Sequence, residues 1–294
     1  MTMKPENTNF TSSTEAGQRI LSRFLSVDEL LIRPSADMSS DRLSIDGEEK
    51  KVVSRISLER FQELEQCIRN SPADAQPYEE LANIYFQQER WRDARRVLDL
   101  GISHNPNHEP MLVLREEVLL LGSTNELENA KRKWRQSRTE EHDQYLQRCE
   151  VDLANLRLTV CEARLARHPD QTELLIPCAI ALRQLGRMEE AIEKLQKAQQ
   201  EPLLRSRASL QLGMCLQQVG RVTDALSSYR KAALYRSPQP PADIKKRALE
   251  LAADLAEQQG MIHSAIQYLQ YLLEANSNSE DIRGRIRKLQ GIPL

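Results

Sequence analysis

The chain has 294 residues, with 41 Lys and Arg against 43 Asp and Glu, and this near balance excludes a general electrostatic attraction to nucleic acid or to an anionic membrane. A hydrophobic content of 40% beside 4% aromatic residues and 10 glycines favours a helical protein. Apolar stretches fall short of the roughly 20 residues of a transmembrane helix, and no signal peptide pattern opens the chain, so we expect a soluble, cytoplasmic protein.

Residues 1–54 differ in composition from the rest of the chain. They are rich in Ser, Thr, Asn and Asp and have no sustained hydrophobic period, so a largely disordered tail is expected. One segment, 15–31, repeats apolar residues at the spacing of a single helix face: Ile20, Phe24, Val27 and Leu31. This short amphipathic helix would either fold back as a cap or dock onto another protein, and the sequence leaves both interpretations open.

Residues 55–138 are expected to form an N-terminal block of helices. A lone helix at 55–70 would cover the end of the block. The segment 75–108 has the pattern of two well-formed helices joined by a turn. A poorer helical pair is predicted to follow at 109–121 and 125–138.

Residues 139–168 predict one long helix. No Gly or Pro interrupts the segment before Pro169, and apolar residues recur every three or four positions: Tyr145, Cys149, Leu153, Leu156 and Val160. The helix would bridge the N-terminal block and the block that follows.

Residues 169–294 form a C-terminal block with an internal repeat. Helical pairs are expected at 172–205, 206–239 and 246–277, with a closing helix at 279–290. Gly186 and Gly220 are 34 residues apart, as are Ala191 and Ala225. Such a period of paired helices is typical of a stacked solenoid rather than of a closed globule.

Residue size at the repeated positions agrees with paired helices. Small residues such as Ala82, Gly213 and Ala225 allow two helices to approach closely, while Tyr78 and Tyr229 fill the remaining space. In spacing and residue type, the chain resembles the tetratricopeptide repeat (TPR) family. The resemblance covers residues 55–290 and implies an all-α fold, a right-handed superhelical α-solenoid of TPR helical pairs.

The same resemblance implies a binding surface. In TPR proteins, the first helices of the repeats line a concave groove that usually binds peptides. The corresponding positions here are Glu79, Asn83, Ile176, Ile180, Arg183, Arg207, Leu210, Met214 and Gln217. Glu79 stands where the family's carboxylate-binding clamp would have lysine, which argues against a terminal carboxylate as ligand.

Part of this set is apolar: Ile176, Ile180, Leu210 and Met214 would form a continuous strip in the groove. An exposed strip of this kind is normally covered. Either the protein's own long helix or tail would cover it, or an apolar segment of a partner would.

No motif predicts chemistry. The sequence contains no phosphate-binding loop, nucleophile elbow or metal-ligand spacing, so we expect no enzyme activity, no cofactor and no metal.

Five cysteines without a close pair are expected to be reduced thiols, mostly in the core. His104 and His108 flank Pro106 in a turn and are expected to face solvent. The basic run around Trp134 is interpreted as a solvated helix face rather than a nucleic-acid site.

Binding, rather than catalysis, is therefore the predicted function. The chain would be a protein-protein interaction scaffold or adaptor that holds a partner peptide or helix in the concave TPR groove. The alternative is a structural solenoid that associates with itself. The repeats alone do not determine which ligand is bound, so the partner's identity stays open.

Overall fold

The structure is a computed structural model, and it describes residues 58–275 and 280–291. The predicted tail and its amphipathic segment 15–31 lie outside the described residues. Within the described ranges the chain is helical and contains no strand, which confirms the all-α fold class. The chain divides into two compact units, Met1–Gly122 and Ser123–Leu294, which are described separately below.

The described part of the first unit is built from three complete helices and the start of a fourth. These are α4 (Leu58–Asn70), α5 (Gln76–Gln87), α6 (Trp91–His104) and α7 (Glu109–Gln136). Buried apolar side chains form its core, including Leu64, Tyr78, Leu81, Leu98 and Met111. Gly101 belongs to this core, because a Cβ on it would lie 2.8 Å from the Met111 sulfur and 2.9 Å from the Tyr78 ring.

Helix α7 corrects the prediction of two helices at 109–121 and 125–138. It is one helix of 28 residues. The segment between the two expected helices contains no proline, and Gly122 does not adopt a positive φ. Instead, the missing side chain of Gly122 leaves room for Trp91, whose Cβ lies 3.4 Å from the position of an added Cβ. The division between the two units falls at this glycine, inside α7.

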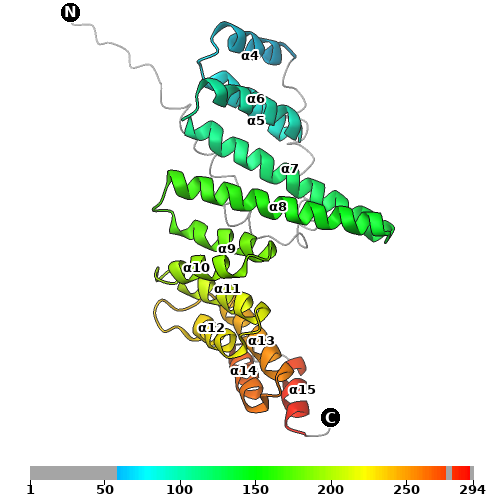
Figure 1. The fold of residues 1–294 in the computed structure, drawn as a ribbon, viewed down its shortest axis with the longest axis vertical. Coiled ribbons are helices and arrows are strands. Elements are labelled where there is room, and N and C mark those ends of the chain that lie inside the picture. The colour runs from blue at the N-terminus through cyan, green and yellow to red at the C-terminus, as the bar shows by residue number, and fades with distance from the viewer. Residues whose placement is uncertain (1–57, 276–279, 292–294) are drawn as a thin grey trace, which may run out of the picture. The chain divides into compact units, whose positions relative to one another are not determined.

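The second unit contains the rest of α7 and a series of further helices that Figure 1 shows stacked in chain order. They are α8 (Glu140–Arg167), the 3-10 turn η1 (Thr172–Leu174), α9 (Leu175–Gln184), α10 (Met188–Ala198), α11 (Arg205–Gln218), α12 (Val222–Leu234), α13 (Ala242–Gln258), α14 (Ile262–Ala275) and α15 (Glu280–Leu289). Helix α8 packs against α9. The long helix is part of the second unit.

Three helical pairs, α9 with α10, α11 with α12 and α13 with α14, share one type of turn. Gly186, Gly220 and Gly260 occupy these turns with φ of +78°, +82° and +68°. Glycine adopts this left-handed backbone without a steric penalty, so the chain reverses sharply and the two helices pack side by side. The pairs confirm the solenoid of tetratricopeptide-like repeats.

Helix α15 closes the stack on α14 and also reaches α13 through an ion pair. Its Arg285 donates hydrogen bonds of 2.7 Å to a carboxylate oxygen of Asp254 and of 2.7 Å to one of Glu257. Both acids belong to α13, the first helix of the last pair. They are therefore neutralised within the chain.

Candidate binding groove

The two predicted groove residues of the first unit, Glu79 and Asn83, are half-buried on α5. The Glu79 carboxylate lies 3.1 Å from Nδ1 of His108. Burial raises the pKa of Glu79, and the nearby His108 opposes this shift. The prediction that His108 faces solvent is wrong, because the turn after α6 directs its ring onto α5; His104 is exposed, as predicted.

The predicted apolar strip is not a surface. Ile176, Ile180 and Leu210 expose only 4%, 9% and 4% of their area. Their helices, α9 and α11, pack against each other as well as against the second helix of each pair. These three side chains therefore offer almost no exposed apolar surface to a partner.

The remaining predicted groove residues of the second unit lie at the surface of α9 and α11. Arg183, Arg207, Met214 and Gln217 are all half-buried. The groove surface thus consists of two arginines, one thioether and one amide rather than of branched aliphatic side chains. It is suited to polar or acidic groups and offers one flexible apolar contact.

Arg183 is the least compensated of these residues. Its Nε is buried and has no hydrogen-bond partner, and the described residues provide no acid that pairs with it. A half-buried guanidinium without a counter-ion costs free energy, because desolvation is not offset by an ion pair. A carboxylate from a ligand would offset that cost.

Two neighbouring ionisable groups locate the Arg183 charge. Burial raises the pKa of the Cys215 thiol to about 11 and that of the Tyr229 hydroxyl to about 12. The positive charge of Arg183 opposes the shift at both groups. The guanidinium on α9 is therefore close to side chains of α11 and α12, at the meeting point of two repeats.

A hydrogen bond between Tyr229 and Gln217 holds two polar side chains near Arg183. The Tyr229 hydroxyl donates to Oε1 of Gln217 over 2.6 Å. On the same helix, Oε1 of Gln211 is buried without a hydrogen-bond partner. Sequence reasoning did not select Gln211, because its position is not among those that line the groove in TPR proteins. An unpaired acceptor on α11 and an unpaired donor on α9 match the main-chain groups of a peptide.

The acidic side chains on α13 already form ion pairs within the chain. Glu250 lies 3.5 Å from Arg247 and 4.0 Å from Lys246, while Asp254 and Glu257 pair with Arg285. Their carboxylates are therefore already compensated by basic side chains of the same unit.

Nothing in the described ranges gathers three or more His, Cys, Asp or Glu side chains that could hold a metal ion. No described helix is long and apolar enough to cross a membrane. All five cysteines are free thiols; four are buried and Cys67 is exposed.

The turn glycines, the small residues between paired helices and the stacked order define an α-helical repeat protein of the tetratricopeptide type. Residues 119–236 match the model of one family, the bacterial transcriptional activator domain. This range covers less than half of the chain and extends from α7 to just beyond α12. No curated protein is similar enough in sequence to match the chain.

Similar solved structures share little sequence with this chain. YrrB, described as a TPR protein with an unusual peptide-binding site, is 16% identical over 76% of this chain and 97% of that chain, with a TM-score of 0.48. MamA is 16% identical over 69% of this chain and 92% of that chain, with a TM-score of 0.46. Naa15/Naa10 bound to HypK-THB is 15% identical over 83% of this chain and 38% of that chain, with a TM-score of 0.44.

Proposed function

We propose that the chain is a non-catalytic interaction scaffold and that α9 and α11 bind a peptide or helix of a partner protein. The observation that carries this proposal is Arg183, a half-buried guanidinium whose Nε has no partner. A ligand carboxylate placed on Arg183 would form a charge-assisted hydrogen bond, which contributes about 1.5–3 kcal/mol in proteins. The preferred ligand is thus a segment that carries an acidic residue.

Affinity in this proposal does not come from the buried aliphatic residues. Arg183 and Arg207 would orient the acidic group, and Met214 would provide an adaptable apolar contact. Gln211 would pair with the main chain of the ligand after its side chain rotates toward the surface. The Gln217 side chain is already held by Tyr229 and would act as a fixed wall.

The absence of catalysis belongs to the same proposal. Burial moves the pKa of Cys215 to about 11 and that of Tyr229 to about 12, away from the range of a nucleophile or a general base at neutral pH. The balanced charge gives no reason to expect nucleic acid as ligand. A cytoplasmic location completes the proposal.

The first test is a selection from a library of random dodecapeptides displayed on phage, with the full chain as bait. The proposal expects enriched peptides to carry Asp or Glu. Two double variants, checked by circular dichroism, then locate the site. Arg183→Ala with Arg207→Ala removes the groove charges; Arg187→Ala with Arg221→Ala removes the same charge from the turns of the same two repeats.

The turn arginines are a matched control because they are exposed and pair only with neighbouring acids. Arg187 bonds to Glu190, and Arg221 bonds to Asp224. Exposed pairs of this kind contribute about 0–1 kcal/mol to stability. Loss of peptide binding in the groove variant alone supports the proposal. If the two double variants bind the selected peptides with the same affinity, the proposal is contradicted.

Light scattering separates the scaffold from the alternative of a self-associating solenoid. A mass that stays that of one chain over a hundredfold range of concentration supports the scaffold. A mass that rises to that of a dimer or larger, and does so equally in the groove variant, favours self-association.

A further inference from the structure

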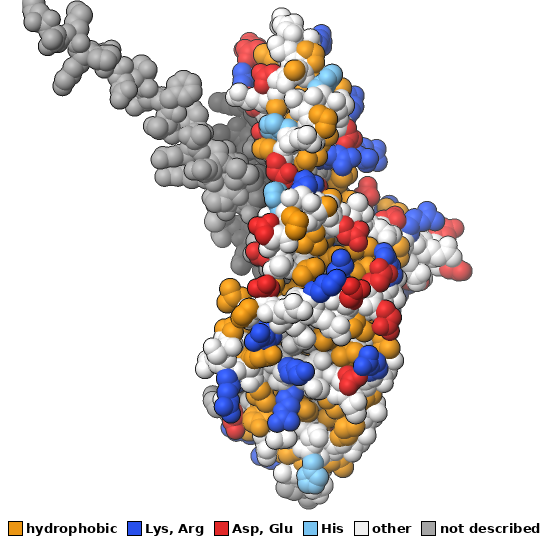
Figure 2. All heavy atoms as spheres, turned by 60° about the vertical axis from the view of Figure 1, so that its left-hand side comes forward, with side chains coloured by type: hydrophobic (Ala, Val, Ile, Leu, Met, Phe, Trp, Pro, Cys, Tyr) orange, Lys and Arg blue, Asp and Glu red, His pale blue; other side chains and the backbone are white. Residues whose placement is uncertain are grey.

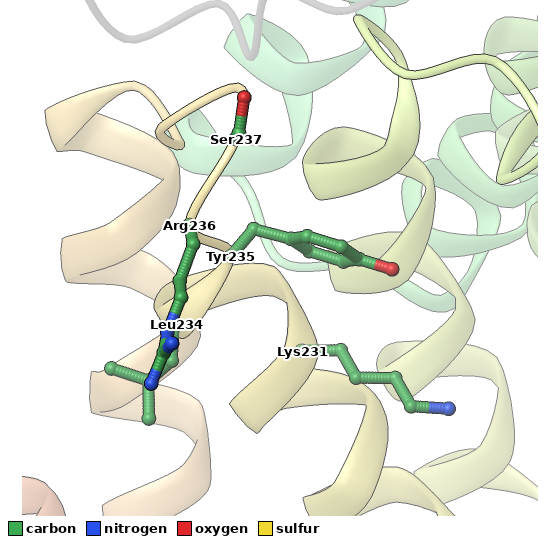
Figure 3. Close-up of a pocket in the computed structure, with 5 residues that line it drawn as sticks. All are labelled: Lys231, Leu234, Tyr235, Arg236 and Ser237. Atoms are coloured by element: carbon green, nitrogen blue, oxygen red, sulfur yellow. The ribbon is translucent and has the colours of Figure 1, made fainter.

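A second surface lies where α12 ends, apart from the α9 and α11 groove. A pocket of about 450 Å³ is lined by Lys231, Leu234, Tyr235, Arg236 and Ser237. In Figure 3 the side chains of Tyr235 and Lys231 extend in one direction, whereas Arg236 extends in another. Two cations therefore flank an apolar wall from different sides. The volume lies within the range of sites that hold a small ligand or a large side chain.

The wall of this pocket is held in place by the neighbouring helix. Tyr235 ends α12 with an extended backbone, φ −61° and ψ 135°. The guanidinium carbon of Arg205, at the start of α11, lies 5.1 Å from the centre of the Tyr235 ring. Arg205 is itself fixed, because its Nε donates to the Gln199 carbonyl over 3.1 Å. The aromatic wall is thus already ordered before any ligand arrives.

The two cations of the pocket have no pairing acid. Several other basic side chains of the second unit pair with acids three or four residues away, as in Arg187 with Glu190, Lys197 with Glu193 and Arg221 with Asp224. Lys231 and Arg236 are exposed, and no described acid forms an ion pair with either of them. No acid lines the pocket. Figure 2 shows basic side chains gathered over the C-terminal helices, with few acidic ones between them.

We propose that this pocket docks an acidic segment of a partner protein. An apolar side chain of that segment would enter beside Tyr235 and Leu234, and carboxylates on either side of it would pair with Lys231 and Arg236. Charge complementarity argues for this occupant, because the pocket offers two cations and an apolar wall and is lined by no acidic side chain.

The proposal does not depend on the groove. Lys231 to Ser237 belong to the end of α12 and the loop after it, whereas the groove residues belong to α9 and α11. A partner could use either surface alone. The experiment below therefore includes the groove variant as a separate arm.

The probes are fluorescein-labelled peptides of about nine residues with a central Phe or Leu. One set flanks this residue with Glu and Asp, a second with the neutral amides Gln and Asn, and a third with Lys. Fluorescence anisotropy with the full chain measures the dissociation constants. We expect binding of the acidic set alone, with an affinity that falls as salt increases because exposed charges are screened.

The variant that tests the pocket is Lys231→Glu with Arg236→Glu, and we expect at least a tenfold loss of affinity for the acidic set. The single variants Lys231→Glu and Arg230→Glu are the matched pair, because they make the same charge reversal at neighbouring residues of α12, and Arg230 lies near Tyr268 instead of lining the pocket. Lys231→Glu should weaken binding and Arg230→Glu should not. Because the groove is itself proposed to bind acidic groups, each protein is also measured with Arg183→Ala and Arg207→Ala added, and the loss of affinity caused by the pocket substitutions should persist on that background. Circular dichroism checks that each variant is folded.

Three results would overturn the proposal. The first is no binding by any acidic peptide. The second is equal binding of the acidic and amide sets. The third is an affinity that falls as much in Arg230→Glu as in Lys231→Glu, or pocket substitutions that cause no loss once the groove arginines are replaced.

Discussion

The ring of Tyr229 lies against the backbone of Gly213, so that a Cβ on residue 213 would stand 2.5 Å from two of its ring carbons. One turn further along α11, Gln217 accepts the hydrogen bond from the same tyrosine. Gly213 and Tyr229 thus join the two helices of one repeat and place the hydrogen bond between Tyr229 and Gln217 near Arg183.

Gly213→Ala should destabilise the protein by roughly 1–3 kcal/mol, because the added methyl group overlaps a fully buried ring. Urea denaturation followed by circular dichroism measures the change. Gly284→Ala is the control, since it is also in a helix but has no atom within 4 Å of the added Cβ. It should be neutral or stabilise by up to about 1 kcal/mol, as expected for alanine in a helix. Equal effects of the two substitutions would contradict the contact.

Glu89→Gly should stabilise the first repeat. Glu89 has a φ of 58° at the position of α5 and α6 where later repeats have Gly186 and Gly220. A side chain in this left-handed conformation costs roughly 1 kcal/mol more than glycine, and the exposed carboxylate forms no contact that would be lost. The greater flexibility of glycine in the unfolded chain offsets part of this gain. A lower urea midpoint in the variant would show that Glu89 is not strained.

Stability should fall in alkaline solution. The unfolded chain releases the Cys215 and Tyr229 protons near their ordinary pKa values of 9.0 and 10.0, whereas the folded chain keeps them to about 11 and about 12. The folded state therefore binds more protons in this window, and the free energy of unfolding decreases as pH rises from about 9 to about 12. The decrease should be roughly 2 kcal/mol or less for each group.

Tyr229→Phe tests the contribution of the hydroxyl to this pH dependence. The variant loses the hydrogen bond to Gln217 at every pH, but the fall in its unfolding free energy above pH 10 should be shallower than in the natural chain. Urea denaturation at several pH values gives both slopes. Identical slopes would mean that Tyr229 titrates in the folded state as it does in the unfolded chain.

One thiol should react rapidly with Ellman's reagent in the folded protein, and all five should react in urea. The thiolate is the reactive form; Cys67 is exposed, whereas burial raises the pKa of Cys178 and Cys215 and shields all four buried thiols. Cys67→Ser should abolish the rapid reaction. A second rapid thiol in that variant would show local opening of the core.

The repeat is the part of the fold that could be predicted from the sequence. Gly186, Gly220 and the large and small residues around them have fixed spacing, because the geometry of the turn and of the helix contact demands it. The positions of the turns and the long helix α8 follow from such local rules. The continuity of α7 does not, since Gly122 is as compatible with a helix packed on Trp91 as with a break.

The candidate site was harder to predict. Family positions identified Arg183, Arg207, Met214 and Gln217 as surface residues of α9 and α11. They also placed Ile176, Ile180 and Leu210 in the open groove, whereas packing between α9 and α11 buries these three side chains. The degree of burial depends on how closely neighbouring repeats approach, which the sequence of one helix does not determine. The pairing of Asp254 and Glu257 with Arg285 joins residues about thirty positions apart and has no local signal.

The most direct test of the groove is the dissociation constant of a display-selected acidic peptide, measured by fluorescence anisotropy on the natural chain and on the two arginine double variants. Arg183→Ala with Arg207→Ala should weaken binding at least tenfold, which corresponds to about 1.4 kcal/mol, while Arg187→Ala with Arg221→Ala should leave it unchanged. The same dissociation constant for all three proteins would contradict a binding site at Arg183.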